Sequence, residues 1–323
     1  MSAVAALVSV VIPCFNEIGS LRELYLRVRT ELVQLPGNSE IIFIDDGSTD
    51  GSVELLRELA AEDANCKVIY FRRNCGKAAA LQVGFRAATG KYVITMDADL
   101  QDDPQEIPRF LTALGTFDVV SGWKATRHDP LEKRLPSRLF NATVRHFTGV
   151  QLHDMNCGFK GYRRAVLQEI ALYGELHRYI PALAAARGFT IGELAVTHHA
   201  RTTGKSKYGL ERYLRGLFDL MTVVYITKYR FRPLHLFGSA GLGLLALGLL
   251  LLACLSIPLN LGRSPVWQYP FWWLSSAFCV VGPTLIGLGI LAEGQLANGF
   301  QAQPLPPVAA TLNLQENGAR HDG

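Results

Sequence analysis

The sequence predicts an α/β domain built on a mostly parallel sheet, followed by two long apolar helices. Between residues 7 and 121, apolar runs of strand length alternate with segments whose apolar residues recur at helical spacing. Such alternation is typical of a parallel sheet covered by helices on both faces. Further along, residues 234–257 and 270–292 contain no formally charged side chain. Each of these runs is long enough to cross the core of a lipid bilayer.

Composition limits the class of protein. The chain has 323 residues, of which 49% are hydrophobic, and this length fits two domains or one domain with a membrane part. A formal net charge of +4 is too small to indicate a nucleic-acid partner. The six cysteines show no paired spacing, so reduced thiols in a cytosol-facing protein are the simplest explanation. The first residues lack the basic region of a signal peptide.

The predicted strands are apolar runs bounded by polar or turn-forming residues. They lie at residues 7–13, 40–44, 67–71, 92–96, 118–121 and 191–197. The predicted helices follow from apolar residues at helical spacing and from capping or breaking residues. They lie at about 21–32, 53–60 and 78–88, in a segment opened by Pro104, and from Glu175 to Gly188.

Polar residues gather where the predicted strands end. The ends of the first, second and fourth strands carry Asn16 and Glu17, Asp45 and Asp46, and Asp97 and Asp99, and the third strand leads to Lys77. In open parallel sheets, ligands bind outside the carboxyl ends of the strands, so we expect a ligand site here. Neither the glycine-rich dinucleotide fingerprint nor a phosphate-binding P-loop is present in the sequence.

Asp97 and Asp99 are the strongest candidates for binding a metal. Side chains at i and i+2 of an extended segment point the same way, so both carboxylates can reach one cation. Oxygen ligands suit Mg²⁺ or Mn²⁺, which commonly bridges substrate phosphates. An Asp-x-Asp pair alone is weak, because Asp is common in turns. The other polar residues expected at the same edge favour the metal site.

Basic residues are concentrated after the predicted sheet. A solvated basic face and an anion-binding segment both remain open, and the position beside a predicted phosphate site favours anion binding. The basic residues of this segment are Lys124, Arg127, His128, Lys133, Arg134 and Arg138. A His/Cys zinc site near His153 and Cys157 fits no standard spacing.

The C-terminal part predicts a membrane anchor. Residues 210–225 form an amphipathic pattern, more often a core face, but the two spans that follow favour a position in the membrane interface. Lys228, Arg230 and Arg232 precede the first span, whereas only Arg263 lies in the connection, which predicts a cytoplasmic catalytic part and cytoplasmic termini. The expected divisions are a domain at 1–207, a juxtamembrane helix at 208–232, a two-helix anchor at 233–292 and a disordered tail at 293–323.

These features together indicate a reaction. A metal at a diphosphate-binding edge points to a nucleotide-sugar donor, because the metal neutralises the leaving nucleoside diphosphate. A membrane anchor beside a basic segment points to an anionic lipid acceptor. If the acceptor is a phosphate monoester, its second pKa is about 6, so it is largely ionised at neutral pH and needs no strong general base.

Five motifs resemble the family 2 glycosyltransferases of GT-A fold, and more narrowly the polyprenyl-phosphate glycosyltransferases, which include bactoprenol glucosyltransferases and dolichol-phosphate mannose and glucose synthases. The motifs are Asp45-Asp-Gly-Ser-Thr-Asp50, Asp97-Ala-Asp-Leu-Gln-Asp102, Asn156-Cys-Gly-Phe-Lys160, Glu175-Leu-His-Arg-Tyr179 and Gly204-Lys-Ser-Lys-Tyr208. The resemblance covers about residues 7–292. It implies a metal-dependent inverting transfer from a UDP- or GDP-sugar to polyprenyl phosphate, with UDP-glucose as the first expectation and GDP-mannose as the second. It also implies a bacterial inner-membrane location and a homo-oligomer.

The resemblance assigns roles to residues of this sequence. The implied metal and diphosphate ligands are Asp97, Asp99 and Gln101. The implied donor-binding residues are Pro13, Glu17, Asp45, Asp46, Lys77, Asp97, Arg201 and Lys207. The implied acceptor-phosphate residues are Lys124, Arg127, Lys133, Arg134, Ser137 and Arg138. The implied catalytic residues are Asp99, Asp154 and Arg178.

Two other readings of the sequence stay open. One is an enzyme of the same fold that glycosylates a lipid headgroup or builds a polymer. Its Gln-x-x-Arg-Trp motif differs from Glu175-x-x-Arg178-Tyr179 at both ends, and its additional spans are not visible. The other is a non-catalytic membrane scaffold or flippase component, for which Asp99 would be dispensable.

Overall fold

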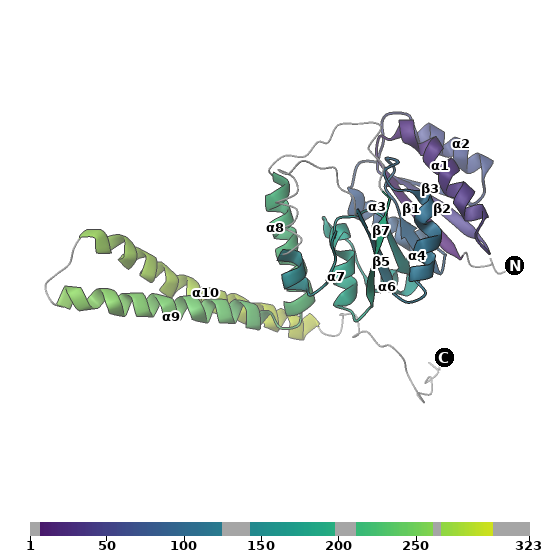
Figure 1. Cartoon of the computed structure of the whole chain (residues 1–323). Helices are drawn as coiled ribbons and strands as arrows, with labels where there is room; N and C mark the ends of the chain where they lie inside the picture. Colours follow the sequence, from purple (N-terminus) through teal and green to yellow (C-terminus); the bar gives the residue numbers. More distant parts are fainter. Residues whose placement is uncertain (1–6, 125–142, 198–210, 261–265, 300–323) are drawn as a thin grey trace, which may run out of the picture. The chain divides into compact units, whose positions relative to one another are not determined.

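The computed structural model describes residues 7–124, 143–197, 211–260 and 266–299 (Figure 1). The chain forms two compact units, Met1–Thr227 and Lys228–Gly323. The first unit contains a sheet of seven strands in the order β3-β2-β1-β4-β6-β5-β7. The strands are β1 (Val8–Cys14), β2 (Ser39–Asp45), β3 (Cys66–Tyr70), β4 (Tyr92–Thr95), β5 (Val119–Lys124), β6 (Lys160–Arg163) and β7 (Ile191–Val196).

The sheet is mostly parallel, as predicted. Strands β1 to β4 pair in parallel, and so do β5 and β7. Of the described strands, only β6 runs antiparallel, against both β4 and β5. This strand was not predicted, because its four residues, Lys-Gly-Tyr-Arg, lack an apolar run. It joins the β5–β7 pair to the four parallel strands.

Helices cover both faces of the sheet. The helices of this unit are α1 (Ile18–Val33), α2 (Ser52–Glu62), α3 (Lys77–Ala87), α4 (Ile107–Ala113), α6 (Arg164–Glu169), α7 (Ile180–Ala185) and α8 (Glu211–Val224), with 3₁₀ turns η1 (Pro104–Glu106) and η2 (Leu176–Tyr179). Alternate residues of β2 enter different core clusters: Ile41 and Phe43 lie with α1 and α2, whereas Ile42 and Ile44 lie with α3 and α7. Both faces of the central strands are therefore buried, which explains why they read as continuous apolar runs.

Close packing of α3 brings Lys77, its first residue, to the carboxyl edge of the sheet. Gly84 of this helix lies so near the sheet that an added Cβ would be 2.5 Å from Val11 and 2.7 Å from Ile44. A larger residue would require either the helix or these two side chains to move. The glycine therefore allows the close approach of α3 to the sheet, and α3 carries Lys77, a predicted donor-binding residue.

A buried carboxylate ties three parts of the chain together at the opposite edge of the sheet. Glu40 is 4% exposed and accepts hydrogen bonds from the Ser9 hydroxyl (2.5 Å) and from the backbone N–H (2.7 Å) and hydroxyl (2.8 Å) of Thr89. It also pairs with Lys67 at 2.5 Å. Burial alone would raise the pKa of this carboxyl, but the bonds from Lys67, Ser9 and Thr89 together hold the pKa below its ordinary value of 4.5.

Glu40→Gln is expected to lower the free energy of unfolding by about 1–3 kcal/mol at pH 7, because a buried charge-assisted network loses its acceptor. A lowered folded-state pKa stabilises the fold above the unfolded pKa, and this contribution is lost as the pH falls through the folded value. The difference between the variant and the natural protein should therefore shrink below pH 4.5. Denaturant unfolding of both proteins in detergent at several pH values measures this difference in the free energy of unfolding.

Glu58→Gln provides the matched control. Glu58 is paired with Arg22 at 2.9 Å, but its side chain is 62% exposed. Removing this charge should change the stability by less than about 0.5 kcal/mol. Equal effects of the two substitutions would contradict the special role of the Glu40 network.

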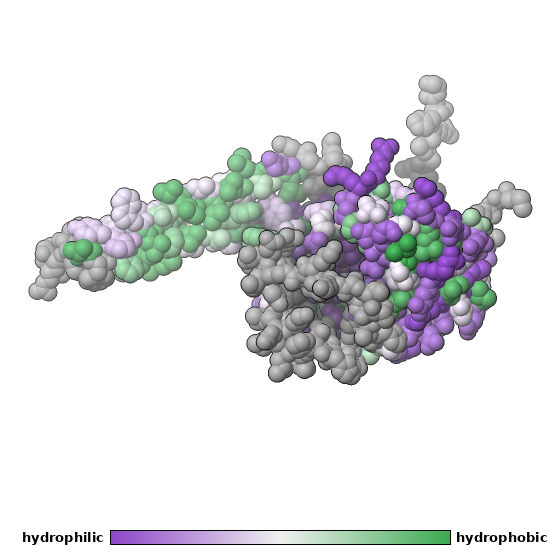
Figure 2. Space-filling view, turned by 90° about the horizontal axis from the view of Figure 1, so that it is seen from above, coloured by the Kyte–Doolittle hydropathy of each residue, from purple (hydrophilic) through white to green (hydrophobic). Residues whose placement is uncertain are grey.

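The second unit is a helical hairpin of α9 (Pro233–Asn260) and α10 (Tyr269–Gly299), the latter preceded by the 3₁₀ turn η4 (Val266–Gln268). Residues Pro233–Ile257 and Tyr269–Leu296 are long and apolar enough to cross a membrane, by length and composition. The two apolar helices predicted from the sequence are thus present, and Figure 2 shows hydrophobic side chains along much of the hairpin. Their backbones approach closely: a Cβ added at Gly241 would lie 2.5 Å from the carbonyl oxygen of Gly282.

Candidate functional site

The loops that follow β1 and β2 are bonded to each other at the carboxyl edge of the sheet. The Asn16 side chain accepts a hydrogen bond from the Thr49 N–H (2.8 Å), and the Asn16 N–H donates to the Ser48 hydroxyl (2.9 Å). The Glu17 N–H donates to the Ser52 hydroxyl at 3.2 Å. These bonds set the geometry of the edge at which Pro13, Glu17 and Asp45 were predicted to bind a nucleoside.

Asp45 and Asp46 lie side by side in the chain but have different partners. Asp45 is fully buried; one of its oxygens accepts from the N–H groups of Gly47 and Ser48, and the other has no hydrogen-bond partner within the described residues. Asp46 instead accepts from the N–H groups of Cys75 (2.6 Å) and Gly76 (2.9 Å). Asp45 therefore keeps one buried acceptor unsatisfied within the described residues, whereas Asp46 holds the loop that leads to Lys77.

The Asp97–Asp99 segment is a turn, which corrects the local structure assumed from the sequence. β4 ends at Thr95, and the chain then turns through Leu100, whose φ is +62°. The argument that residues i and i+2 of a strand share one face therefore does not apply. The turn is held by bonds from the Asp97 N–H to Asp102 (3.2 Å) and from the Gln101 N–H to Asp99 (3.3 Å).

Lys77 pairs with the carboxylate of Asp97. Burial lowers the pKa of the Lys77 ammonium, but Asp97 and, more weakly, Asp102 and Asp99 outweigh it and raise the pKa. Lys77 thus stays charged and provides positive charge at the edge where a diphosphate was predicted.

The residues at this turn fit a hard divalent cation. Within the described ranges, no group of three or more His, Cys, Asp or Glu side chains could hold a metal by itself. The predicted set has two carboxylates and the amide of Gln101, all oxygen donors, and Asp97 is 38% exposed. Mg²⁺ typically takes one or two carboxylates and completes its shell with water and substrate phosphates, so this smaller set is sufficient.

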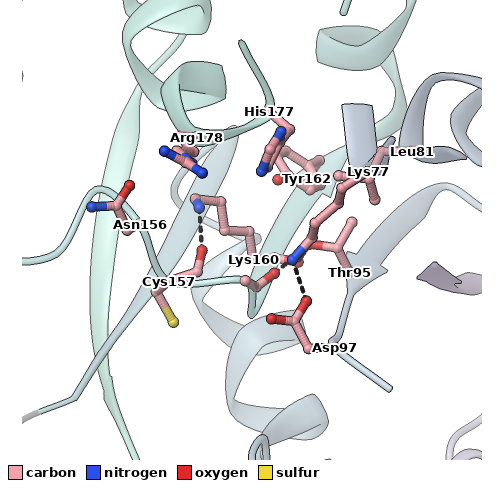
Figure 3. Close-up of a pocket in the computed structure, with 11 residues that line it drawn as sticks. Lys77, Leu81, Thr95, Asp97, Asn156, Cys157, Lys160, Tyr162, His177 and Arg178 are labelled. Atoms are coloured by element: carbon pink, nitrogen blue, oxygen red, sulfur yellow. Dashed lines mark hydrogen bonds and ion pairs between the residues drawn. The ribbon is translucent and has the colours of Figure 1, made fainter. Parts of the chain in front are cut away.

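A cavity of about 190 Å³ opens beside Asp97 (Figure 3). It is lined by side chains from three distant parts of the chain: Lys77 and Asp97 at the strand edge, Asn156 and Lys160 around the start of β6, and His177 and Arg178 from η2. The structure therefore brings together three predicted residues, Lys77, Asp97 and Arg178. Arg178 is paired with Glu175 at 2.7 Å.

Asp154 does not line this cavity. It is 5% exposed, accepts a hydrogen bond from the Asn156 N–H (3.1 Å), and its own N–H donates to Glu193 (3.3 Å). Asp154 therefore shapes the loop that carries Asn156. Its predicted catalytic role stays a prediction.

Several predicted residues lie outside the described part of the chain. Lys124 ends β5, and its side chain is not described. The others are Arg127, Lys133, Arg134, Ser137, Arg138, Arg201 and Lys207. Conversely, Asn156, Lys160 and His177 line the cavity although the sequence assigned them no role. All three stand in motifs that carried the family resemblance, and this was the available signal.

The sequence pattern of the family described as Glycosyl transferase family 2 matches residues 9–171, which include β1 to β4, the Asp97 turn and β6. The chain belongs to glycosyltransferase family 2. The family resemblance predicted from the motifs is thereby confirmed.

Two relatives of this family 2 glycosyltransferase match nearly the whole chain. Dodecaprenyl-phosphate galacturonate synthase of Rhizobium johnstonii is 39% identical over 88% of this chain and 86% of its own length. Undecaprenyl-phosphate 4-deoxy-4-formamido-L-arabinose transferase of Pseudomonas aeruginosa is 38% identical over 92% of this chain and 88% of its own. Both matches are too long to be confined to the region of the family pattern.

Solved structures confirm the GT-A fold. Glucosyl-3-phosphoglycerate synthase from Mycobacterium tuberculosis, in complex with Mn²⁺ and UDP-glucose, has a TM-score of 0.52 and 20% identity, covering 69% of this chain and 79% of its own. The same enzyme with Mg²⁺ and UDP also has a TM-score of 0.52, at 19% identity.

Proposed function

We propose that this family 2 glycosyltransferase transfers a sugar from a nucleotide-sugar to polyprenyl phosphate, giving an inverted, β-linked lipid-phosphate sugar. The observation that carries the proposal is the similarity, over at least 86% of their length, to relatives named for transfer to dodecaprenyl and undecaprenyl phosphate. The two apolar helices fit an acceptor that resides in a membrane. The non-catalytic scaffold is disfavoured, because the acidic turn and the cationic cavity beside it fit a working diphosphate site.

The proposed donor site uses the residues of the sheet edge. The unpartnered oxygen of Asp45 would accept an N–H of the nucleobase, beside Pro13 and Glu17. Asp97, Asp99 and Gln101 would hold Mg²⁺ or Mn²⁺, which when bound supplies positive charge to the leaving nucleoside diphosphate. Lys77 adds a fixed ammonium at the same place. Arg201 and Lys207 are proposed to contact the donor phosphates.

The acceptor phosphate is proposed to bind the basic segment of Lys124, Arg127, Lys133, Arg134, Ser137 and Arg138. As a phosphate monoester with a second pKa of about 6, it attacks already ionised. Asp99, Asp154 and Arg178 would act by positioning and charge rather than as a strong general base. The proposed orientation places the catalytic domain (1–207) and both termini in the cytoplasm, with 208–232 as a juxtamembrane helix, 233–292 as the anchor in a bacterial inner membrane and 293–323 as a tail.

The identity of the transferred sugar is proposed from the names of the relatives. The family resemblance favoured UDP-glucose, but the relatives are named for galacturonate and 4-deoxy-4-formamido-L-arabinose. Galacturonate and L-arabinose have the same configuration at ring carbons 2, 3 and 4, and glucose differs from both at carbon 4. A donor of this galacto configuration is therefore favoured over UDP-glucose and GDP-mannose.

A donor panel tests the proposal. Purified protein in detergent with polyprenyl phosphate is incubated with labelled UDP-glucose, UDP-galacturonate, UDP-4-deoxy-4-formamido-L-arabinose or GDP-mannose. We expect label in the organic phase from a galacto-configured donor and its loss on addition of EDTA. Label from none of the four donors would contradict the proposed function, and label that persists in EDTA would contradict metal dependence.

A further inference from the structure

The cavity beside Asp97 contains two buried polar atoms without partners. The side-chain oxygen of Asn156 and Nδ1 of His177 have no hydrogen-bond partner within the described residues, and both residues line the cavity (Figure 3). Leaving buried polar atoms unsatisfied costs free energy, roughly 1–3 kcal/mol each. A bound molecule with hydroxyl groups would satisfy both atoms, and a sugar ring is such a molecule.

His177 is suited to bind hydroxyl groups because it stays neutral. Burial, together with the charges of Lys77 and Arg178, lowers the pKa of its imidazole to about 3. A neutral imidazole has one donor and one acceptor nitrogen, so it can bind a hydroxyl in either direction. We therefore interpret His177 as a side chain that binds a ligand in the cavity, rather than as one that takes up and releases protons.

The same cavity carries more positive than negative charge. Among the described residues that line it, Lys77, Lys160 and Arg178 are basic, and Asp97 is the one acidic residue. Lys77 is paired with Asp97, and Arg178 with Glu175. Lys160 is only 3% exposed, and its ammonium donates to the backbone carbonyls of Met155 (3.2 Å) and Cys157. Among the described residues it has no carboxylate partner.

A buried ammonium with carbonyl partners alone is costly, and an arriving anion would stabilise it. We infer that this cavity binds the sugar ring of the donor and that Lys160 binds an anionic substituent on that ring, the carboxylate of a uronic acid. This inference rests on the proposed function and specifies its donor class. The diphosphate is expected at Lys77 and Asp97, so the ammonium of Lys160 remains for a group on the sugar.

Calorimetric binding without acceptor tests the inference, because no transfer is then required. The donors are UDP-galacturonate and UDP-galactose, which share the nucleotide, the diphosphate and the ring configuration and differ in the carboxylate. The natural protein should bind UDP-galacturonate at least about 10-fold more tightly, the range of a hydrogen bond to a charged group. Lys160→Met should abolish this preference, weakening UDP-galacturonate about 10- to 100-fold and UDP-galactose less than about 3-fold.

Two outcomes would overturn the inference. If Lys160→Met weakened the binding of both donors equally, Lys160 would contact a phosphate group rather than the sugar carboxylate. Equal affinity of the natural protein for the two donors would exclude recognition of the carboxylate, and this arm does not depend on whether the variant folds. If the natural protein prefers UDP-galacturonate but transfers nothing to polyprenyl phosphate, the proposed function fails and the sugar subsite stands.

Discussion

Asp99→Asn is expected to lower kcat/KM for sugar transfer by roughly 100- to 1000-fold, the size of effect seen when a group that stabilises developing charge is removed. The substitution keeps an oxygen that can accept the hydrogen bond from the Gln101 N–H, so the turn should persist. What is lost is the negative charge that is proposed to hold the divalent cation. Initial rates at saturating Mn²⁺, together with Mn²⁺ affinity in the presence of UDP, measure the effect.

Asp103→Asn is the matched control. Asp103 lies four residues further along the same loop, and its side chain caps η1 by accepting from the Gln105 N–H at 3.0 Å. Asn can replace this cap, so the rate should change less than about 3-fold. If Asp99→Asn kept more than a tenth of the natural activity, Asp99 would not be a ligand of the catalytic metal.

Gly158→Ala is expected to reduce activity about 100-fold through one methyl group. A Cβ at this position would lie 2.6 Å from one carboxylate oxygen of Asp97 and 2.7 Å from the other. Asp97 must then move, which breaks its pair with Lys77 and displaces a proposed metal ligand. Misplacement of a positioning group by about 1 Å can cost on the order of 100-fold. Steady-state kinetics and Mn²⁺ titration should both show the loss.

Gly19→Ala controls for the loss of a glycine. Gly19 lies in α1, and an added Cβ meets nothing within 4 Å. This variant should keep full activity and gain up to about 1 kcal/mol of stability, because Ala favours the helix. Full metal-dependent activity in Gly158→Ala would show that the carboxylate of Asp97 tolerates displacement.

The sequence predicted the parallel part of the sheet well because its strands are buried on both faces. Residues such as Ile42 and Phe43 belong to opposite core clusters, so the strand reads as one apolar run. β6 was not predicted because its sequence has no apolar run; its position in the sheet depends on pairing with β4 and β5. The predicted local structure at Asp97 was wrong because β4 ends at Thr95, two residues before Asp97. Met96 is apolar, so the sequence pattern does not show where the strand ends.

The helix before the hairpin shows another limit of sequence patterns. The predicted apolar stripe of residues 210–225 included Phe218 and Met221, which are exposed, whereas Leu220 and Val223 were not assigned to it and are buried in the core of the first unit. The hydroxyl of Tyr179 in η2 also donates to the Gly216 carbonyl of this helix at 3.1 Å. Periodicity identifies an amphipathic helix but does not show which apolar residues pack inward.

The cavity was predicted only in part because its residues are distant in sequence. Asp97 and Lys77 follow parallel strands whose carboxyl ends lie at the same edge of the sheet, so the topology of the sheet is enough to expect them at that edge. Lys160 and His177 reach the same place through the antiparallel β6 and the turn η2, neither of which was predicted in its observed form. Their charges and unpartnered atoms become visible only once the fold is known.

Stoichiometry of the two products tests the central claim most directly. Release of the nucleoside diphosphate and formation of the lipid-phosphate sugar are followed together, with and without polyprenyl phosphate. We expect equal amounts of both products, negligible release of the nucleoside diphosphate without the lipid, and loss of both products with EDTA. Release of the nucleoside diphosphate at the same rate without polyprenyl phosphate, with no glycosylated lipid formed, would contradict it.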